Sequence, residues 1–232
     1  MNDLKQTISA NVEAVQQRIS EAALRSGRTA NDVKLVAVTK YAQDDWVQCL
    51  SEIHPVFGEN RPQQLATRVP QFDPSIEWHL IGQLQRNKVR LALPLCHTIH
   101  SVDSWKLLDR IELLAGEMEV KPRILLEVNV SGEESKAGFQ PDSIRQDFKK
   151  LTLLQHTQID GLMTMAPAGD AESTRKFFSQ LRQLADDLRD LTGLTLPELS
   201  MGMSGDFEVA IEEGATIVRV GSRLFDGLGY RG

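Results

Sequence analysis

The sequence of 232 residues lacks several features that would place it in a specialised class of proteins. Its only cysteines, Cys49 and Cys96, have the spacing of neither a metal site nor a redox pair, so we expect reduced thiols. The net charge of −6 is opposite in sign to that of a general nucleic-acid binder. No stretch approaches the roughly 20 apolar residues of a membrane span, and the first residues lack the apolar run of a signal peptide. We therefore expect a cytoplasmic protein that binds neither nucleic acid nor membrane.

The sequence also lacks Gly-x-Gly-x-x-Gly after its first predicted strand, which argues against a dinucleotide-binding fold, and it has no linker rich in Pro, Gly or Ser. It has a regular alternation of strand and helix patterns instead. We predict strands at 34–40, 55–60, 76–82, 98–103, 123–130, 158–165, 198–203 and 216–221. We predict helices at 43–53, 61–72, 83–93, 104–117, 141–154, 171–192 and 206–213, with an extra amphipathic helix at 3–26.

Strict alternation of strand and helix predicts a parallel sheet, and eight repeats predict its closure into a barrel. The expected fold class is therefore α/β, with a single (β/α)8 TIM-type barrel domain over residues 1–232 and the extra helix packed across its outside or bottom. In such barrels the active site lies at the carboxyl ends of the strands. The residues at those ends are Lys40, Asn60, Gly82, Met165, Met203, Ser204, Gly221 and Ser222.

The first predicted strand delivers a lysine to this end of the barrel. Residues 35–38 form an unbroken apolar run, as expected for a strand that is covered on both faces, and Lys40 follows. Taken alone, Lys40 is better explained as a solvated strand end than as a functional amine. The rest of the sequence favours the functional amine.

Small residues gather in the loops after the seventh and eighth strands. The segment Ser200-Met-Gly-Met-Ser204 runs toward a helix, and Gly221-Ser222 follows the last strand. Backbone N–H groups and hydroxyls in such loops bind anions, and barrels often bind phosphate there. The alternative is helix capping by Ser204 or Asp206, which would explain one loop but not both.

Arg219 lies within the last strand, on the same face as Ile217 and Gly221. A buried guanidinium needs acceptors because it does not lose its proton. Two partners are open: a carboxylate of a neighbouring strand such as Glu127, or a ligand beside the phosphate site. A lysine, a phosphate site and an arginine together suit an aldehyde-bearing phosphate such as pyridoxal 5′-phosphate (PLP). A sugar-phosphate aldolase that uses Schiff-base chemistry would fit the same residues.

Several segments resemble the pyridoxal phosphate homeostasis protein family (YggS/PROSC). The matching segments are Val36-Ala-Val-Thr-Lys40, Phe57-Gly-Glu-Asn60, Trp78-His-Leu-Ile-Gly-Gln-Leu-Gln-Arg-Asn-Lys88, Leu199-Ser-Met-Gly-Met-Ser204 and Val218-Arg-Val-Gly-Ser222. The sequence departs from the family pattern at Leu224-Phe-Asp-Gly227, where the family usually passes from Phe directly to Gly. The resemblance implies the fold of the alanine racemase N-terminal barrel.

The resemblance also implies a set of cofactor-binding residues. PLP would be held as a Schiff base on Lys40, and Arg219 would face the ring nitrogen. The remaining cofactor-binding residues would be Asn60, Ser200, Ser204, Gly221 and Ser222. Lys136 would lie near the ring hydroxyl.

Family membership implies a PLP carrier or regulator of vitamin B6 pools without catalytic turnover. Alanine racemase adds a second domain that supplies a tyrosine acid/base, and we expect no such domain here. Of the two tyrosines, Tyr41 follows Lys40 but is expected at a helix start. The main alternative is a PLP-dependent amino-acid racemase-like enzyme. We expect a monomer, and the partners left open are PLP-dependent apo-enzymes and a regulatory protein.

Overall fold

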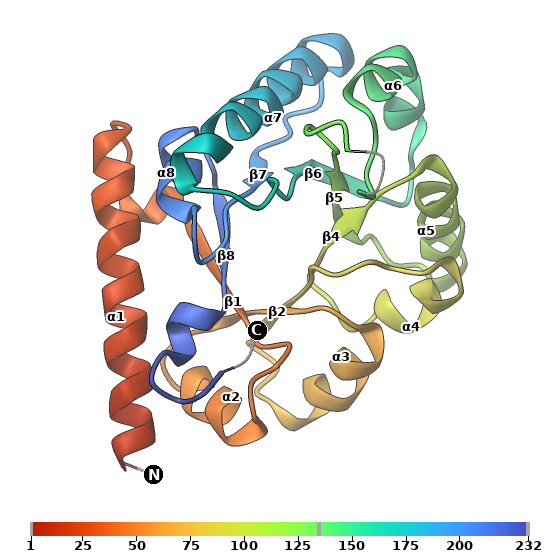
Figure 1. Cartoon of the computed structure of the whole chain (residues 1–232). Helices are drawn as coiled ribbons and strands as arrows, with labels where there is room; N and C mark the ends of the chain where they lie inside the picture. The colour runs from red at the N-terminus through yellow and green to blue at the C-terminus, as the bar shows by residue number, and fades with distance from the viewer. Residues whose placement is uncertain (1, 134–135, 231–232) are drawn as a thin grey trace.

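The computed structural model, which describes residues 2–133 and 136–230, shows eight parallel strands closed into a barrel (Figure 1). Each strand pairs with the next along the chain, and the last pairs with the first. The strands are β1 (Lys34–Val38), β2 (Val56–Glu59), β3 (Glu77–Leu80), β4 (Thr98–Val102), β5 (Arg123–Glu127), β6 (Gln158–Met163), β7 (Glu198–Ser200) and β8 (Ile217–Val220). The predicted (β/α)8 barrel is confirmed. Every strand ends before its predicted limit, so most of the predicted site residues lie just beyond the strands.

Helices alternate with the strands and form the outer layer of the barrel (Figure 1). The α-helices are α1 (Asn2–Arg25), α2 (Asp44–Ser51), α3 (Pro62–Arg68), α4 (Val89–Ala92), α5 (Trp105–Met118), α6 (Pro141–Gln146), α7 (Ala171–Thr192) and α8 (Phe207–Glu212). Short 3₁₀ helices are η1 (Ala30–Asp32), η2 (Val69–Gln71), η3 (Arg86–Lys88), η4 (Phe148–Leu153) and η5 (Ser222–Phe225).

Three of the predicted helices are wrong in length. The helix expected at 61–72 divides into α3 and η2, because Pro70 has no N–H for an α-helical hydrogen bond. The helix expected at 83–93 is reduced to η3 and α4, and Pro94 follows soon after α4 ends. The helix expected at 141–154 divides into α6 and η4 at Asp147.

The strands separate two apolar clusters, because successive side chains of a strand point to opposite sides of the sheet. The small cluster inside the barrel consists of Val36, Val56, Leu125, Met163 and Ile217. The larger cluster lies between the sheet and the helices. The small inner cluster leaves the remaining interior to polar side chains, and these form the candidate site.

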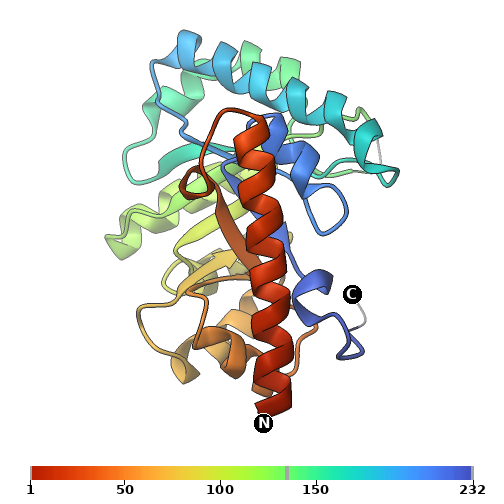
Figure 2. The same cartoon turned by 90° about the vertical axis from the view of Figure 1, so that its left-hand side faces the viewer.

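The extra helix α1 runs along the outside of the barrel, as Figure 2 shows. Its buried face carries Ile8, Val12, Val15 and Ile19, each at most 4% exposed, and it packs against α2, α8 and η5. The opposite face is polar and exposed, as expected for an amphipathic surface helix. Within the described ranges, no helix is both long enough and apolar enough to cross a membrane.

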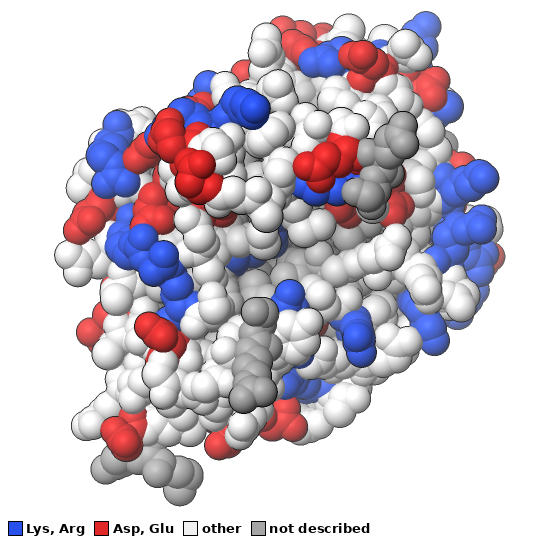
Figure 3. Space-filling view, in the orientation of Figure 1, with Lys and Arg blue, Asp and Glu red and all other residues white. Residues whose placement is uncertain are grey.

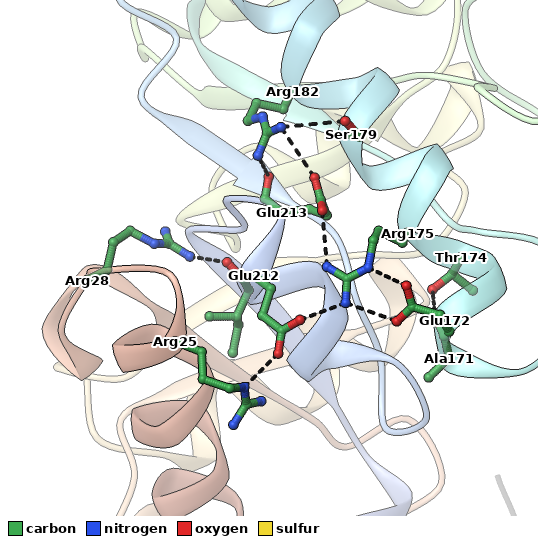
Figure 4. Close-up of polar contacts among 11 residues, drawn as sticks. Arg25, Arg28, Ala171, Glu172, Thr174, Arg175, Ser179, Arg182, Glu212 and Glu213 are labelled. Atoms are coloured by element: carbon green, nitrogen blue, oxygen red, sulfur yellow. Dashed lines mark hydrogen bonds and ion pairs between the residues drawn. The ribbon is translucent and has the colours of Figure 1, made fainter.

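Ion pairs connect α1, α7 and α8 near one end of this helix (Figure 4). Arg175 of α7 contacts Glu172 at 2.6 Å, Glu212 at 2.7 Å and Glu213 at 3.1 Å. Glu212 also accepts a hydrogen bond from Arg25 of α1 at 2.7 Å. Exposed pairs contribute little individually, so the apolar face of α1 must supply most of the stabilisation.

Replacement of Ile8 by alanine tests this assignment. Ile8 is fully buried, and large-to-small substitutions at such positions cost about 2–5 kcal/mol of unfolding free energy. Urea unfolding should show this loss for Ile8→Ala, whereas Gln16→Ala on the exposed face should change stability by less than about 0.5 kcal/mol. Equal effects of the two substitutions would contradict the packing of α1 described above.

Candidate functional site

A cavity of about 590 Å³ opens at the carboxyl ends of the strands. Figure 3 shows this face hollowed near its centre, with basic side chains in and beside the hollow. Its wall includes six of the seven predicted cofactor-binding residues: Lys40, Asn60, Ser204, Arg219, Gly221 and Ser222. Gly82, Met165 and Met203 also line it. The seventh residue, Ser200, is fully buried and is not part of the wall.

The backbone on both sides of Lys40 is held by a buried ion pair. Arg68 of α3 donates hydrogen bonds to the Thr39 carbonyl at 2.9 Å and to the Ala42 carbonyl at 2.7 Å. The same guanidinium pairs with Glu59, which also accepts a hydrogen bond from the Thr39 hydroxyl at 2.5 Å. Because this arrangement fixes the chain before and after Lys40, the lysine side chain projects from a rigid base.

The Lys40 amine itself makes no ion pair with any residue that the structure describes. Its nitrogen lies 5.0 Å from the ring centroid of Tyr41, a cation–π contact. Lys40 is partly exposed and lines the cavity, where its amine can meet a bound ligand. An amine without a carboxylate partner is free to react with an electrophile.

The two loops expected to bind phosphate meet at one side of the cavity. The Gly221 N–H donates a hydrogen bond to the Ser204 hydroxyl at 3.2 Å. Asp206 accepts from the backbone N–H of Met203 at 2.7 Å, and no side chain caps the start of α8. The capping alternative therefore explains neither loop. A side chain at position 221 would be crowded, because a Cβ there would lie 3.3 Å from the Val38 carbonyl oxygen.

Arg219 lies below the cavity with 4% of its surface exposed. It donates hydrogen bonds to the Ser200 hydroxyl at 2.5 Å and to the Thr164 carbonyl at 3.0 Å. No salt bridge joins it to Glu127, although both residues are in the described part of the chain. Burial lowers the pKa of Arg219 to about 10, and the nearby carboxylates of Asp206 and Glu127 act in the opposite direction. The guanidinium therefore stays charged at neutral pH.

A row of buried polar groups continues from Arg219 through the barrel interior. Ser200 lies 2.9 Å from His100 Nδ1, and His100 Nε2 lies 2.7 Å from His79 Nδ1. Because arginine only donates, Ser200 accepts from Arg219, and we assign its own hydrogen to His100. His100 then donates to His79, whose Nε2 lies 3.6 Å from a Glu77 carboxylate oxygen.

This row keeps both histidines neutral and orients the acceptor that holds Arg219. Burial lowers the pKa of His79 and of His100, and for His100 the neighbouring His79 and Arg219 lower it further. The sequence analysis missed the two histidines, although the segment pattern contained a signal. His79 and Ile81 are two residues apart, so their side chains lie on the same face of the sheet, the face that points into the barrel. The sequence pattern therefore predicts an interior position for the polar side chain of His79.

Glu127 and Tyr230 are two further cavity residues that the sequence analysis did not assign to the site. Burial raises the pKa of Glu127 to about 7, the charge of Asp103 raises it further, and Arg219 opposes this. Tyr230 belongs to the segment after η5, whose irregular backbone gives no strand or helix pattern from which its direction could be inferred.

Two residues singled out in the sequence lie outside the cavity wall. Lys136 forms an ion pair with Glu133 at 3.2 Å, so its amine does not point freely into the site. Tyr41 lies in the turn before α2 with 57% of its surface exposed. Its ring contacts that of Tyr230, with 6.2 Å between the ring centroids.

Comparison with known proteins gives a consistent result over nearly the whole chain. Residues 5–228 match the family model described as alanine racemase, N-terminal domain. A pyridoxal phosphate homeostasis protein of Aquifex aeolicus is 41% identical over 214 residues, which cover 91% of this chain and 94% of that protein. The chain belongs to the pyridoxal phosphate homeostasis protein family. Another member, from Pseudomonas aeruginosa, is 36% identical and is covered over 97% of both chains.

Solved structures separate this family from its racemase relatives. PipY of Synechococcus elongatus PCC7942, solved with PLP bound, is 39% identical, has a TM-score of 0.80, and is covered over 91% of this chain and 99% of its own. Alanine racemase of Clostridium difficile 630 has a TM-score of 0.74 but only 17% identity, and the match covers 55% of that enzyme. The likeness to alanine racemase therefore shows the barrel fold alone.

The ionisation of Glu127 should be visible in the stability of the ligand-free protein. Its folded pKa of about 7 lies above the ordinary value of about 4.3, so the folded state holds a proton that the unfolded state releases. The resulting stabilisation is present below about pH 4 and is lost as the pH rises through 7, by about 4 kcal/mol at most. Glu127→Gln, measured by urea unfolding, should therefore become more stable relative to wild type between pH 5 and pH 8.

Glu13→Gln, on the exposed face of α1, is the matched control and should follow the wild-type pH dependence. Parallel pH profiles for wild type and Glu127→Gln would show that Glu127 keeps an ordinary pKa in the cavity.

Proposed function

We propose that this protein binds PLP in the cavity and acts in PLP homeostasis as a carrier or regulator without catalytic turnover. The observation that carries the proposal is the convergence in one cavity of an amine (Lys40) that forms no ion pair with the described residues, two small-residue loops that meet, and a buried cation (Arg219). Relatives with up to 41% identity are named pyridoxal phosphate homeostasis proteins, and PipY was solved with PLP bound. The sugar-phosphate aldolase considered from the sequence has no such support.

The residues of the cavity fit PLP group by group. Lys40 would bind the aldehyde carbon covalently, and Ser204, Gly221 and Ser222 would bind the phosphate. Arg219 would donate a hydrogen bond to the ring nitrogen with N–H groups that Ser200 and Thr164 leave free. Asn60, which lies beside Gly82 in the cavity wall, completes the set. Ser200 would act through Arg219 instead of touching the cofactor.

PLP supplies an aldehyde for covalent attachment and a ring that withdraws electrons best when its nitrogen is protonated. Arg219 disfavours that protonation, because a guanidinium donates a hydrogen bond and cannot accept one. The row formed by Ser200, His100 and His79 keeps the guanidinium in place and offers it no carboxylate partner. This protein therefore binds the ring in its less activating form, which suits storage and transfer better than turnover.

One observation favours the alternative, a racemase-like enzyme. Racemisation at a substrate carbon needs two groups, one that removes the α-proton and one that returns a proton to the opposite face. Lys40 is one such group, and Glu127 lies in the same cavity with a pKa of about 7. Tyr230 does not act as a base, because burial and the charges of Glu59 and Tyr41 raise its pKa to about 12. The enzyme alternative therefore depends on Glu127.

The remaining parts of the proposal concern the whole chain. We propose that residues 1–232 act as one domain, as a monomer in the cytoplasm. The recipients would be PLP-dependent apo-enzymes, or a regulatory protein would dock on the surface. The open mouth of the cavity supports a carrier role, because a carrier must release its ligand to a recipient.

The attachment point can be tested by borohydride reduction of the PLP-loaded protein followed by peptide mass spectrometry. We expect the pyridoxyl group on Lys40, and Lys40→Ala should lose both the label and the visible absorbance band. Lys136→Ala is the matched control, because Lys136 lies outside the cavity wall and pairs with Glu133. A label found on another lysine and absent from Lys40 would disprove this role.

Turnover can be tested by incubation of the loaded protein with L-alanine in deuterium oxide, with the α-proton followed by NMR. We expect exchange far slower than the rate of about 10 per second that is ordinary for enzymes, because the ring nitrogen remains unprotonated. Exchange near that rate, reduced about 100-fold or more in Glu127→Gln, would instead establish the racemase-like alternative.

A further inference from the structure

Tyr230 of the C-terminal segment lines the cavity, although it belongs to none of the strands. The Tyr230 ring stacks on Phe225 with 5.1 Å between centroids and an interplanar angle of 22°. Phe225 is fully buried and stacks in turn on Trp46 of α2 at 5.7 Å. The edge of the Tyr230 ring also meets Tyr41. These contacts fix the ring, so its hydroxyl has a defined position in the cavity wall.

That hydroxyl is buried and has no hydrogen-bond partner among the residues that the structure describes. The backbone of Tyr41 is near enough to favour its ionised form but does not form a hydrogen bond of normal geometry. A buried hydroxyl without a partner costs about 1–3 kcal/mol, so native proteins rarely keep one that nothing satisfies. A ligand that binds in the cavity would satisfy this hydroxyl.

The position of the hydroxyl identifies the part of the ligand that it would meet. The Tyr230 oxygen lies 3.3 Å from the place that a Cβ of residue 221 would occupy. Gly221 is the residue whose N–H reaches the Ser204 hydroxyl, where the loops after β7 and β8 meet. The tyrosine oxygen therefore lies beside the two small-residue loops.

The protonation state of Tyr230 makes its hydroxyl a hydrogen-bond donor at neutral pH. The hydroxyl keeps its proton at neutral pH, since burial raises its pKa and the charge of Glu59 raises it further. It is therefore a hydrogen-bond donor beside the N–H groups and hydroxyls of the two loops. Donors that converge on one point bind an oxyanion, and hydrogen bonds to charged acceptors are stronger than neutral ones.

We propose that the Tyr230 hydroxyl donates a hydrogen bond to the phosphate of the bound ligand and completes the anion site formed by Ser204, Gly221 and Ser222. This inference rests on the proposed function, because it takes PLP as the ligand. It assigns to the segment after η5 a direct part in phosphate recognition. It also explains a glycine at position 221, where any side chain would displace the tyrosine oxygen or the Val38 backbone.

The test compares PLP with pyridoxal, which lacks the phosphate, by absorbance titration of wild type, Tyr230→Phe and Tyr41→Phe. Phenylalanine keeps the stacking on Phe225 and removes only the hydroxyl. We expect Tyr230→Phe to weaken PLP binding at least about tenfold and to leave pyridoxal binding unchanged, since one hydrogen bond to a charged group is lost. Tyr41→Phe should leave both affinities unchanged. The ³¹P NMR resonance of bound PLP should shift in Tyr230→Phe alone.

Each other outcome overturns the inference. Unchanged PLP affinity and an unchanged ³¹P resonance in Tyr230→Phe would show that the hydroxyl does not reach the phosphate. Equal weakening of PLP and pyridoxal would place it at the ring or at Lys40. Failure of the wild-type protein to bind PLP would instead disprove the proposed function itself, so the two failures are distinguishable.

Discussion

The charge on Arg219 is the constraint on which the interior of this barrel depends. A guanidinium that is almost fully buried cannot be neutralised by loss of its proton, so the surrounding residues must supply acceptors. The protein meets this need with neutral groups, the Ser200 hydroxyl and the Thr164 carbonyl, and not with an ion pair. Neutral acceptors hold the cation without cancelling its field, which remains available to a ligand above it.

A second buried arginine, Arg68, differs from Arg219 because it has a carboxylate partner. Arg68 and Glu59 form a direct ion pair behind the first strand, and the guanidinium also holds two backbone carbonyls around Lys40. Loss of one partner of such a pair leaves an uncompensated buried charge, which typically costs 3–5 kcal/mol. Arg219 thus has only neutral acceptors among the described residues, and Arg68 fixes the backbone on both sides of Lys40.

The sequence allowed the fold and nine of the residues that line the cavity to be predicted, because both depend on the strand pattern. Lys40 and Arg219 fall on faces that the alternation of β1 and β8 assigns to the barrel interior. Ser200 was expected in the phosphate-binding loops, but the structure buries it, with its hydroxyl hydrogen-bonded to Arg219. Tyr230 was beyond prediction because its position depends on ring stacking with Phe225 across an irregular segment.

The distribution of polar groups explains how the barrel stays stable although its interior buries polar and charged side chains. Arg219, His100 and Glu127 occupy interior positions where apolar side chains would pack at lower cost. The inner apolar cluster is correspondingly small, and most of the buried apolar surface lies between the strands and the helices. Stability thus comes mainly from the outer layer, which includes α1, while the interior is left to the requirements of the ligand. A separation of this kind lets the residues at the strand ends change their chemistry without loss of the fold.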